Sequence, residues 1–276
     1  MYDPDEAQAQ VITAADAAVV RLVQITDCHI LATADDRLHN MNTRQSFETV
    51  SRAAVENNAD LDLVLATGDL SQDASTSSYQ YLAARFEEIG LPVFWIPGNH
   101  DDDAVMRDHL RASCIFAARQ VLVGNWQVVL LDSTIKGEVG GCVSPQQLEF
   151  LDGALRAHPE RHALVCLHHQ ALAAGSEWID GKGLRQSQQL VDVLKSQANV
   201  KAVLWGHVHQ QAHQRIDGIE WMSTPSSCIQ FKPGSESFAI DDLAPGYRHL
   251  CLYADGSIET AVHRVDTTGG DRLWSG

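Results

Sequence analysis

Residues 91–101 read LPVFWIPGNHD, an apolar segment that ends at a proline and a glycine and continues into Asn99, His100 and Asp101. Apolar residues bounded by Pro and Gly are typical of a buried strand that ends in a turn. A turn requires neither the carboxamide of Asn99 nor the imidazole of His100. These two side chains at the end of a buried strand therefore indicate a functional site.

Similar apolar segments alternate with amphipathic segments along most of the chain. We predict strands at residues 17–26, 61–67, 92–97, 126–133, 162–169 and 200–209, and helices at residues 43–58, 77–90, 144–158 and 184–196. Strands that are apolar nearly throughout and alternate with helices are typical of sheets covered on both faces. The sequence therefore predicts an α/β fold.

The last quarter of the chain has a different pattern. Residues 215–223 and 250–265 each carry Asp-Gly between alternating segments, which is a signal for short hairpins. The sequence contains no internal repeat, low-complexity tract or Pro/Gly/Ser-rich linker. We expect one domain over residues 1–276, with a C-terminal hairpin or cap region at about 211–265.

Composition narrows the class of protein. The 276 residues carry a formal net charge of −16, which argues against a general nucleic-acid or anionic-membrane surface because both favour Lys and Arg. The six cysteines are dispersed, the N-terminus lacks a signal-peptide pattern, and no apolar run approaches the roughly 20 residues of a membrane span. We expect a cytoplasmic protein that binds neither a nucleic-acid polymer nor a membrane; the sequence leaves the oligomeric state open.

Metal-binding side chains follow five of the predicted strands, in the motifs TDCH, GD, GNH, LHH and GHVH. Each motif alone is more often a turn than a ligand set, so the prediction depends on all five occurring in order. The carboxyl ends of neighbouring strands line one crevice, and Asp-x-His or His-x-His in an extended segment puts both side chains on one face. Carboxylate and imidazole ligands suit divalent ions, and two such ions can clamp a phosphate ester. The sequence therefore predicts a two-metal site.

The five motifs resemble the DxH, GD, GNH[DE], H and GHxH pattern of the calcineurin-like metallophosphoesterase superfamily. The resemblance implies a four-layer αββα sandwich, with two mixed sheets flanked by helices and a dinuclear site at the strand ends. Segments outside the motifs, at residues 40–47, 66–80, 162–180 and 224–248, resemble bacterial class III cyclic nucleotide phosphodiesterases that act on 3′,5′-cyclic AMP. That resemblance runs almost from end to end.

The resemblance also implies roles for the motif residues. One divalent ion would be held by Asp27, His29 and His209, and a second by Asn99, His168 and His207, with Asp69 bridging the two. A metal-bridging hydroxide would attack phosphorus and release 5′-AMP. The expected catalytic residues are Asp69, Asn99 and His100, with His100 stabilising the transition state or protonating the leaving 3′-oxygen. Substrate contacts are expected from His29, Asp69, Asn99, His100, His168, His209, Asn42 and Arg44.

Several alternatives stay open on the sequence alone. The ligand set suits Fe²⁺, Mn²⁺, Zn²⁺ or Co²⁺, and the resemblance favours iron. His169 could be the ligand in place of His168, although the family pattern favours His168. Asn42 and Arg44 could simply form a helix N-terminus with a solvated arginine, and Cys28 is interpreted as a packing residue.

The substrate and the activity have alternatives as well. The same metal site could act on a glycerophosphodiester, a nucleotide pyrophosphate link or a phosphomonoester, because loops decide the substrate. A non-catalytic scaffold on the same fold is the most distant alternative, since a scaffold should show broken metal motifs and none is broken here.

Overall fold

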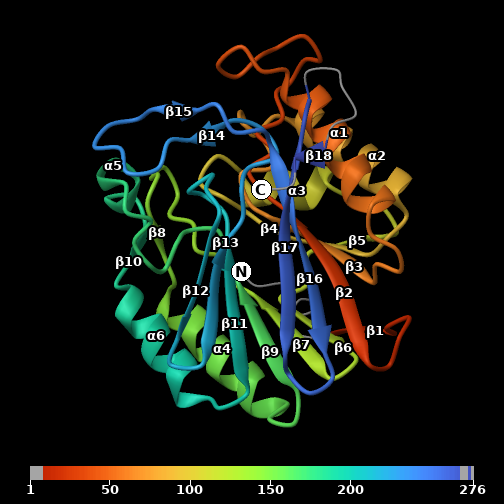
Figure 1. The fold of residues 1–276 in the computed structure, drawn as a ribbon, viewed down its shortest axis with the longest axis vertical. Coiled ribbons are helices and arrows are strands. Elements are labelled where there is room, and N and C mark those ends of the chain that lie inside the picture. Colours follow the sequence, from red (N-terminus) through yellow and green to blue (C-terminus); the bar gives the residue numbers. More distant parts are fainter. Residues whose placement is uncertain (1–8, 268–272, 275–276) are drawn as a thin grey trace.

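The computed structural model describes residues 9–267 and 273–274 of the chain, and its main feature is a pair of seven-stranded sheets (Figure 1). The first sheet has the order β18-β17-β16-β2-β3-β4-β5 and the second the order β1-β6-β7-β9-β11-β13-β12. Strands β2, β3 and β4 are mutually parallel, and so are β7, β9 and β11, whereas β16 is antiparallel to β2. Both sheets are therefore mixed.

The first sheet consists of β2 (Val19–Ile25), β3 (Leu63–Thr67), β4 (Val93–Ile96), β5 (Ile115–Phe116), β16 (Gly246–Tyr253), β17 (Ile258–Val265) and β18 (Leu273–Trp274). The second consists of β1 (Gln10–Ile12), β6 (Gln120–Val123), β7 (Trp126–Leu130), β9 (His162–Cys166), β11 (Val200–Trp205), β12 (Ala212–Ile216) and β13 (Ile219–Ser223). Two short pairs lie outside them, β8 (Gly141–Cys142) with β10 (Leu184–Arg185) and β14 (Gln230–Phe231) with β15 (Ile240–Asp241). The helices are α1 (Thr43–Glu56), α2 (Thr76–Ile89), α3 (Asp103–His109), α4 (Pro145–Ala157), α5 (Glu177–Asp180) and α6 (Ser187–Ser196).

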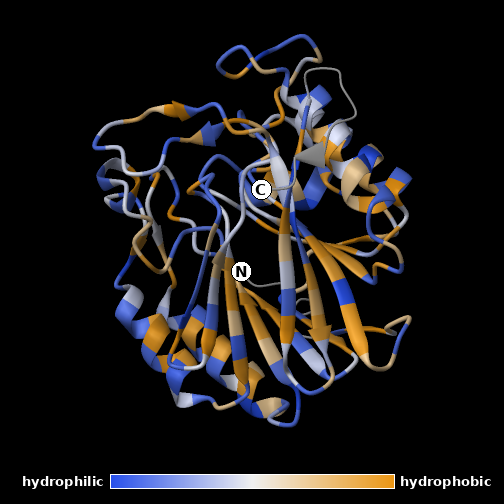
Figure 2. Cartoon of the chain, in the orientation of Figure 1, coloured by the Kyte–Doolittle hydropathy of each residue, from blue (hydrophilic) through white to orange (hydrophobic). Residues whose placement is uncertain are grey.

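Three apolar clusters hold the layers together. One lies between the sheets and joins residues such as Leu22 and Leu65 of the first sheet to Val128 and Leu204 of the second. The second cluster packs the first sheet against α1, α2 and α3, and the third packs the second sheet against α4 and α6. Figure 2 shows the strands as mostly hydrophobic and the helices as mixed, as expected when sheets are covered on both faces. The predicted four-layer αββα sandwich is confirmed.

The predicted helices begin and end at recognisable caps. Asn42 caps α1, accepting from Gln45 N, and Ser144 caps α4, with Pro145 at the first helical position. Gly90 ends α2 with a φ of 71°, a left-handed conformation that glycine adopts without strain. Among the described residues no helix is long and apolar enough to cross a membrane.

The C-terminal hairpins form where Asp-Gly predicts them, but they join different sheets. β12 and β13 turn at Asp217-Gly218 and extend the second sheet, whereas β16 and β17 turn at the Asp255-Gly256 segment and extend the first. The two hairpins, at residues 212–223 and 246–265, therefore add to both layers of the core. Short elements without strong sequence patterns, such as β5 and the β14–β15 pair, were not predicted.

Candidate metal centre

The five motifs lie directly after β2, β3 and β4 of the first sheet and after β9 and β11 of the second. The site is therefore assembled from two sheets, not from the edge of one. Potential ligand atoms lie within 4.8 Å of one another in four groups: Asp27, His29 and His209; Asp27, Asp69 and His168; His29, Asp69 and His100; and His168, His169 and His207. Because Asp27, Asp69, His29 and His168 each belong to two groups, the groups form one continuous cluster.

The backbone at the ligands is not extended, and here the sequence interpretation was wrong. Asp27, His29, His207 and His209 have φ values of 53°, 47°, 64° and 48°, in the left-handed region. β2 and β11 end at Ile25 and Trp205, so the Asp-x-His and His-x-His pairs lie in loops. Left-handed backbone at non-glycine residues costs about 1–3 kcal/mol each and is concentrated at functional sites. Turns, not strand alternation, direct both members of each pair to the cluster.

Two glycines allow the loops to approach this closely. A Cβ built at Gly98 would overlap the backbone nitrogen and carboxylate of Asp69. A Cβ at Gly206 would overlap Thr26 and the carboxylate of Asp27. The absence of a Cβ at these positions therefore lets the backbone crowd against the site.

The first group is organised around two imidazole rings. His209 Nδ1 lies 2.8 Å from the carbonyl oxygen of Ile229, and His29 Nδ1 lies 2.7 Å from Gln72 Oε1. Each Nδ1 therefore carries the hydrogen, which leaves Nε2 as a bare acceptor in the neutral ring. The two Nε2 atoms lie 3.1 Å apart, and His209 Nε2 is 3.3 Å from Asp27 Oδ1. Two bare nitrogens beside a carboxylate are suited to a cation.

A second set of possible ligand atoms is buried without hydrogen-bond partners. Within the described part of the chain, no hydrogen-bond partner is found for Asn99 Oδ1, His168 Nε2 or His207 Nε2. His168 Nδ1 lies 2.9 Å from the Thr67 carbonyl, so Nε2 is again the free nitrogen. It lies 3.3 Å from Asp69 Oδ2, but too misaligned for a hydrogen bond. Buried polar atoms without partners are costly, and a bound cation would satisfy all three.

His169 occupies a different position from His168, although both belong to the cluster. Its Nδ1 lies 2.8 Å from Ser133 Oγ and its Nε2 lies 3.0 Å from the Val139 carbonyl. With both ring nitrogens hydrogen-bonded, His169 has no free lone pair for a metal unless one of these bonds breaks. Its ring packs against His168 and His207, with centroids 5.0 and 4.7 Å away. The geometry favours His168 as the ligand.

Asp69 lies at the centre of the cluster and His100 at its edge. Asp69 Oδ1 accepts from the backbone nitrogen of His100 at 2.8 Å, which leaves Oδ2 facing His168 and, at 3.7 Å, His29 Nε2. His100 is partly exposed, and its Nδ1 lies 3.3 Å from the Gln72 carbonyl. Its ring meets that of His29 edge to face at 5.0 Å. His100 therefore lies where a substrate could reach it.

The charges in the cluster depend on one another. Burial alone would raise the pKa of Asp27 and of Asp69, but His209 and His168 respectively outweigh it, and both pKa values are lowered. Burial lowers the pKa of His29 to about 4. Burial would also lower the pKa of His168, but the charge of Asp69 raises it to about 9. His29 is therefore neutral near pH 7, whereas His168 keeps a proton beside two ionised carboxylates, and a divalent cation would take the place of that proton.

Burial and the neighbouring rings also decide the charge of the two remaining buried histidines. The pKa of His207 lies well below its usual range because the ring is buried beside His169 and His168. Burial and His168 lower the pKa of His169 to about 3. Both rings are therefore neutral near pH 7.

The structure gives both Asn42 and Arg44 structural partners. Asn42 caps α1 and donates to the Ala34 carbonyl at 2.8 Å. Arg44 donates to the carbonyls of Leu31 and Ala32, and its guanidinium lies 4.4 Å from the Tyr81 ring centroid. Arg44 therefore supports the loop that follows His29 instead of lying free in solvent. Contact of either side chain with a nucleotide stays a prediction.

Several residues that hold the ligands in place were not found from the sequence. Gln72 and the carbonyls of Thr67 and Ile229 orient His29, His168 and His209. Asp101 holds neighbouring loops together, since it accepts from the backbone nitrogens of Leu70, Ser71 and Gly98 and from Tyr79. Backbone carbonyls leave no sequence signal, and Gln72 lies in an ordinary polar turn. Cys28 is fully buried, as a packing role requires.

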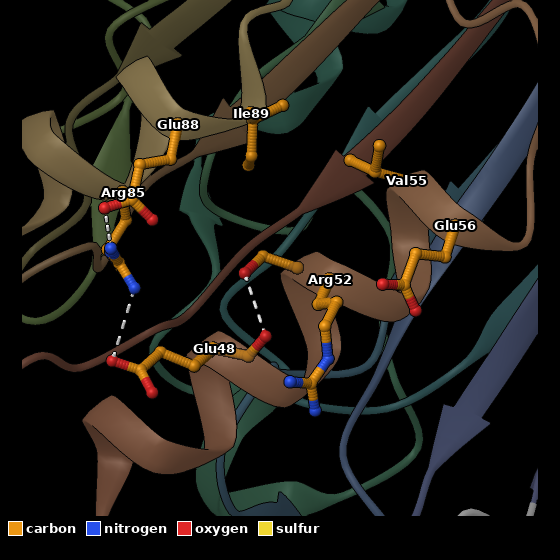
Figure 3. Close-up of a pocket in the computed structure, with 8 residues that line it drawn as sticks. Glu48, Arg52, Val55, Glu56, Arg85, Glu88 and Ile89 are labelled. Atoms are coloured by element: carbon orange, nitrogen blue, oxygen red, sulfur yellow. Dashed lines mark hydrogen bonds and ion pairs between the residues drawn. The ribbon is translucent and has the colours of Figure 1, made fainter.

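A surface pocket lies elsewhere, between α1 and α2 on the outer helical layer (Figure 3). Three of its charged residues pair with one another: Arg85 contacts Glu88 and lies 3.7 Å from Glu48. The ligands at the strand ends do not line this pocket. It is separate from the metal cluster.

Comparison with known proteins gives the class to which this architecture belongs. Residues 20–211 match the calcineurin-like phosphoesterase family, and the chain belongs to that family. Its fold is shared by a dimetal phosphatase from Danio rerio, with a TM-score of 0.60 at 16% identity over 89% of this chain and 98% of that chain. The family implies a dinuclear divalent metal centre, which the clustered histidines and aspartates fit.

Two bacterial relatives are much more similar in sequence. The 3′,5′-cyclic adenosine monophosphate phosphodiesterase CpdA of Haemophilus influenzae is 42% identical over 252 residues, which are 91% of this chain and 92% of that protein. The protein of the same name from Escherichia coli K12 is 42% identical over 255 residues, 92% of this chain and 93% of its own length. The similarity therefore extends beyond the family match.

Proposed function

We propose that this chain is a metal-dependent phosphodiesterase that hydrolyses 3′,5′-cyclic AMP to 5′-AMP. The observation that carries the proposal is the set of buried acceptors, Asn99 Oδ1, His168 Nε2 and His207 Nε2, that lack hydrogen-bond partners beside two ionised carboxylates. A scaffold would gain nothing from maintaining such a costly arrangement. The names of the two bacterial relatives supply the substrate.

The proposed site holds two cations, each with three residues of its own and one shared carboxylate. Asp27, His29 and His209 would hold one cation, and Asn99, His168 and His207 the other, with Asp69 shared between them. When bound, two divalent cations neutralise phosphate charge and lower the pKa of bound water enough to supply a nucleophile near pH 7. We propose Fe²⁺ as the physiological ion, with Mn²⁺, Zn²⁺ or Co²⁺ able to occupy the same nitrogen and oxygen ligands.

His100 is the proposed proton donor to the leaving 3′-oxygen. Its Nδ1 lies 3.3 Å from both the backbone carbonyl oxygen and the side-chain Nε2 of Gln72, so Nδ1 is held by Gln72, and Nε2 is the ring nitrogen that we assign to the leaving oxygen. The backbone nitrogen of His100 holds Asp69 Oδ1 in place, which ties the position of the ring to the shared carboxylate. Asn99 would orient a phosphate oxygen as well as a cation.

The other proposed properties concern the protein's surroundings. The substrate would be a small cyclic nucleotide. The hairpins at residues 212–223 and 246–265 add to both sheets, which supports the expectation of one domain. All six cysteines are free thiols, which supports a reducing, cytoplasmic location.

The direct test is to incubate Mn²⁺- or Fe²⁺-loaded protein with 3′,5′-cyclic AMP and to separate the products by chromatography. We expect 5′-AMP from the wild type, little product from Asn99→Ala, and normal product from Asn57→Ala, which changes an exposed asparagine at the end of α1. Formation of 3′-AMP would contradict the attack geometry. Cleavage of bis(4-nitrophenyl) phosphate but not of cyclic AMP would keep the metal site and reject the substrate.

A further inference from the structure

Three segments outside the metal motifs meet at an aromatic cluster beside His209. The cluster consists of Trp178 in α5, Phe231 in β14, Phe238 in the β14–β15 hairpin and His39 in the loop before α1. These residues belong to the stretches 162–180, 224–248 and 31–42. Figure 1 shows α5 and the β14–β15 hairpin at one end of the molecule. No metal-binding role accounts for this convergence.

One side of the aromatic cluster lies against His209, a proposed metal ligand. The Phe231 ring is stacked on the His209 ring, with centroids 3.9 Å apart and an angle of 6° between the planes. Phe238 and Trp178 meet Phe231 edge to face, with centroids 5.5 and 5.0 Å from it, and they meet each other at 5.3 Å. Phe231 and Trp178 are partly buried in the core beneath, so they support the cluster.

Phe238 is the member that faces outward. Its side chain is 46% exposed, and His39 lies beside it with the ring centroids 5.3 Å apart. The hairpin that carries Phe238 is held in position at its base, because Ile229 O accepts from His209 and Gly234 N donates to Ser176 Oγ at 2.9 Å. An apolar ring that is fixed in an exposed position gains little from burial in the fold, but it offers a surface on which an apolar or aromatic ligand can bind.

We propose that Phe238, supported by Phe231 and Trp178 and bordered by His39, forms the platform on which the purine base of the nucleotide stacks. The inference rests on the proposed function, which places the phosphate at the metal centre next to His209. The ribose then carries the base away from His209, and the aromatic cluster extends from that ring. Aromatic side chains bind the π-face of any base and do not read its edge. The platform therefore accounts for affinity toward purines and not for discrimination between adenine and guanine.

The test compares the affinities of 5′-AMP and ribose 5-phosphate for Mn²⁺-loaded protein by isothermal titration calorimetry. The ratio of the two dissociation constants isolates the contribution of the base to the affinity, because the two ligands differ only in the adenine base. We expect Phe238→Ala to reduce the advantage of 5′-AMP by about fivefold or more, the lower end for loss of one base–aromatic stack. Phe238→Trp should restore the advantage. Leu243→Ala removes a similarly exposed side chain, 53% exposed, from outside the cluster and should match the wild type.

The outcomes separate this inference from the function on which it rests. An unchanged ratio in Phe238→Ala, in a preparation that converts cyclic AMP to 5′-AMP, would overturn the platform alone. An equal loss in Leu243→Ala would also overturn it, because the effect would not be aromatic. Failure of the wild type to cleave cyclic AMP, while it cleaves bis(4-nitrophenyl) phosphate, would overturn the proposed function and the platform together.

Discussion

The Nε2 atoms of His29 and His209 lie 3.1 Å apart, although the two residues are 180 positions apart in the chain and follow strands of different sheets. In both rings Nδ1 is committed to an oxygen acceptor, so neither neutral ring has a hydrogen to place between the two nitrogens. The contact would be repulsive without a cation. The packing of one sheet on the other is therefore what creates the ligand set.

Removal of metal should destabilise the protein, because the buried acceptors then lose their only partner. A ligand that binds only the folded state stabilises it by about 2.7 kcal/mol at 100 times its dissociation constant. We expect Tm to fall after treatment with a chelator and to recover when Mn²⁺ is restored, as measured by differential scanning calorimetry. An identical Tm with and without metal would show that the cluster holds no structural cation.

Replacement of His168 and of the adjacent His169 should have different effects on metal content. His168→Ala removes a free Nε2 and should lower the content from two ions toward one per chain. His169→Ala removes a ring whose nitrogens already bind Ser133 and Val139, so both ions should remain at saturating metal, with affinity reduced about 10- to 100-fold. Elemental analysis by mass spectrometry measures the content. The reverse pattern would make His169 the ligand.

Gln72 should control metal affinity without being a ligand, since its Oε1 accepts from His29 Nδ1. Gln72→Leu removes that acceptor, and we expect a roughly 10- to 100-fold weaker affinity for Mn²⁺, as is usual for partners of metal-bound histidines. Gln72→Glu keeps an oxygen acceptor and serves as the control. Competition with a fluorescent chelator gives the dissociation constants, and equal affinity in wild type and Gln72→Leu would reject this role.

Substitution by alanine should change the free energy of unfolding in opposite directions at two glycines, Gly98 and Gly153. Gly98→Ala places a Cβ against the backbone nitrogen and carboxylate of Asp69, and we expect a loss of about 1–3 kcal/mol in the free energy of unfolding, as for other overpacked sites. Gly153 lies within α4 with open space around it, so Gly153→Ala should stabilise by about 0.5–1 kcal/mol. Urea unfolding compares the two. Similar free energies for both variants would contradict the close approach at Gly98.

Arg248 should not tolerate lysine, although its charge would be kept. It is 2% exposed and donates to Thr224 Oγ1, Thr260 Oγ1 and the carbonyls of Ala212 and Ser223. Burial lowers the pKa of Arg248 to about 10, so it is charged at pH 7. A lysine cannot reach all four acceptors, and each buried group left unpaired costs about 1–3 kcal/mol.

The measurement for Arg248→Lys is again the free energy of unfolding in urea. Arg215→Lys provides the control, because that side chain is 70% exposed on β12 and its replacement should change stability by less than about 0.5 kcal/mol. If Arg248→Lys lowers the free energy of unfolding by no more than Arg215→Lys does, the four hydrogen bonds of Arg248 are dispensable.

The sequence by itself determined the layers and singled out the residues of the five motifs, which the structure brings together. Helix periodicity, the caps Asn42 and Ser144, and the Asp-Gly turns are local patterns, so they could be read directly. The five motifs could also be read, because their residue types and order are unusual. Strand ends were placed up to four residues too late, as at Cys166 and Trp205, since a histidine in a loop and one in a strand look alike in sequence.

Only the tertiary structure decided how those residues are oriented. Whether His168 or His169 presents a free nitrogen depends on the oxygens of Thr67, Ser133 and Val139, which lie far away in the chain. The aromatic cluster beside His209 likewise joins three segments that share no local pattern. The hydrogen bonds of a histidine ring decide which of its nitrogens keeps a free lone pair. Here the partners of those bonds come into place only when the two sheets pack together.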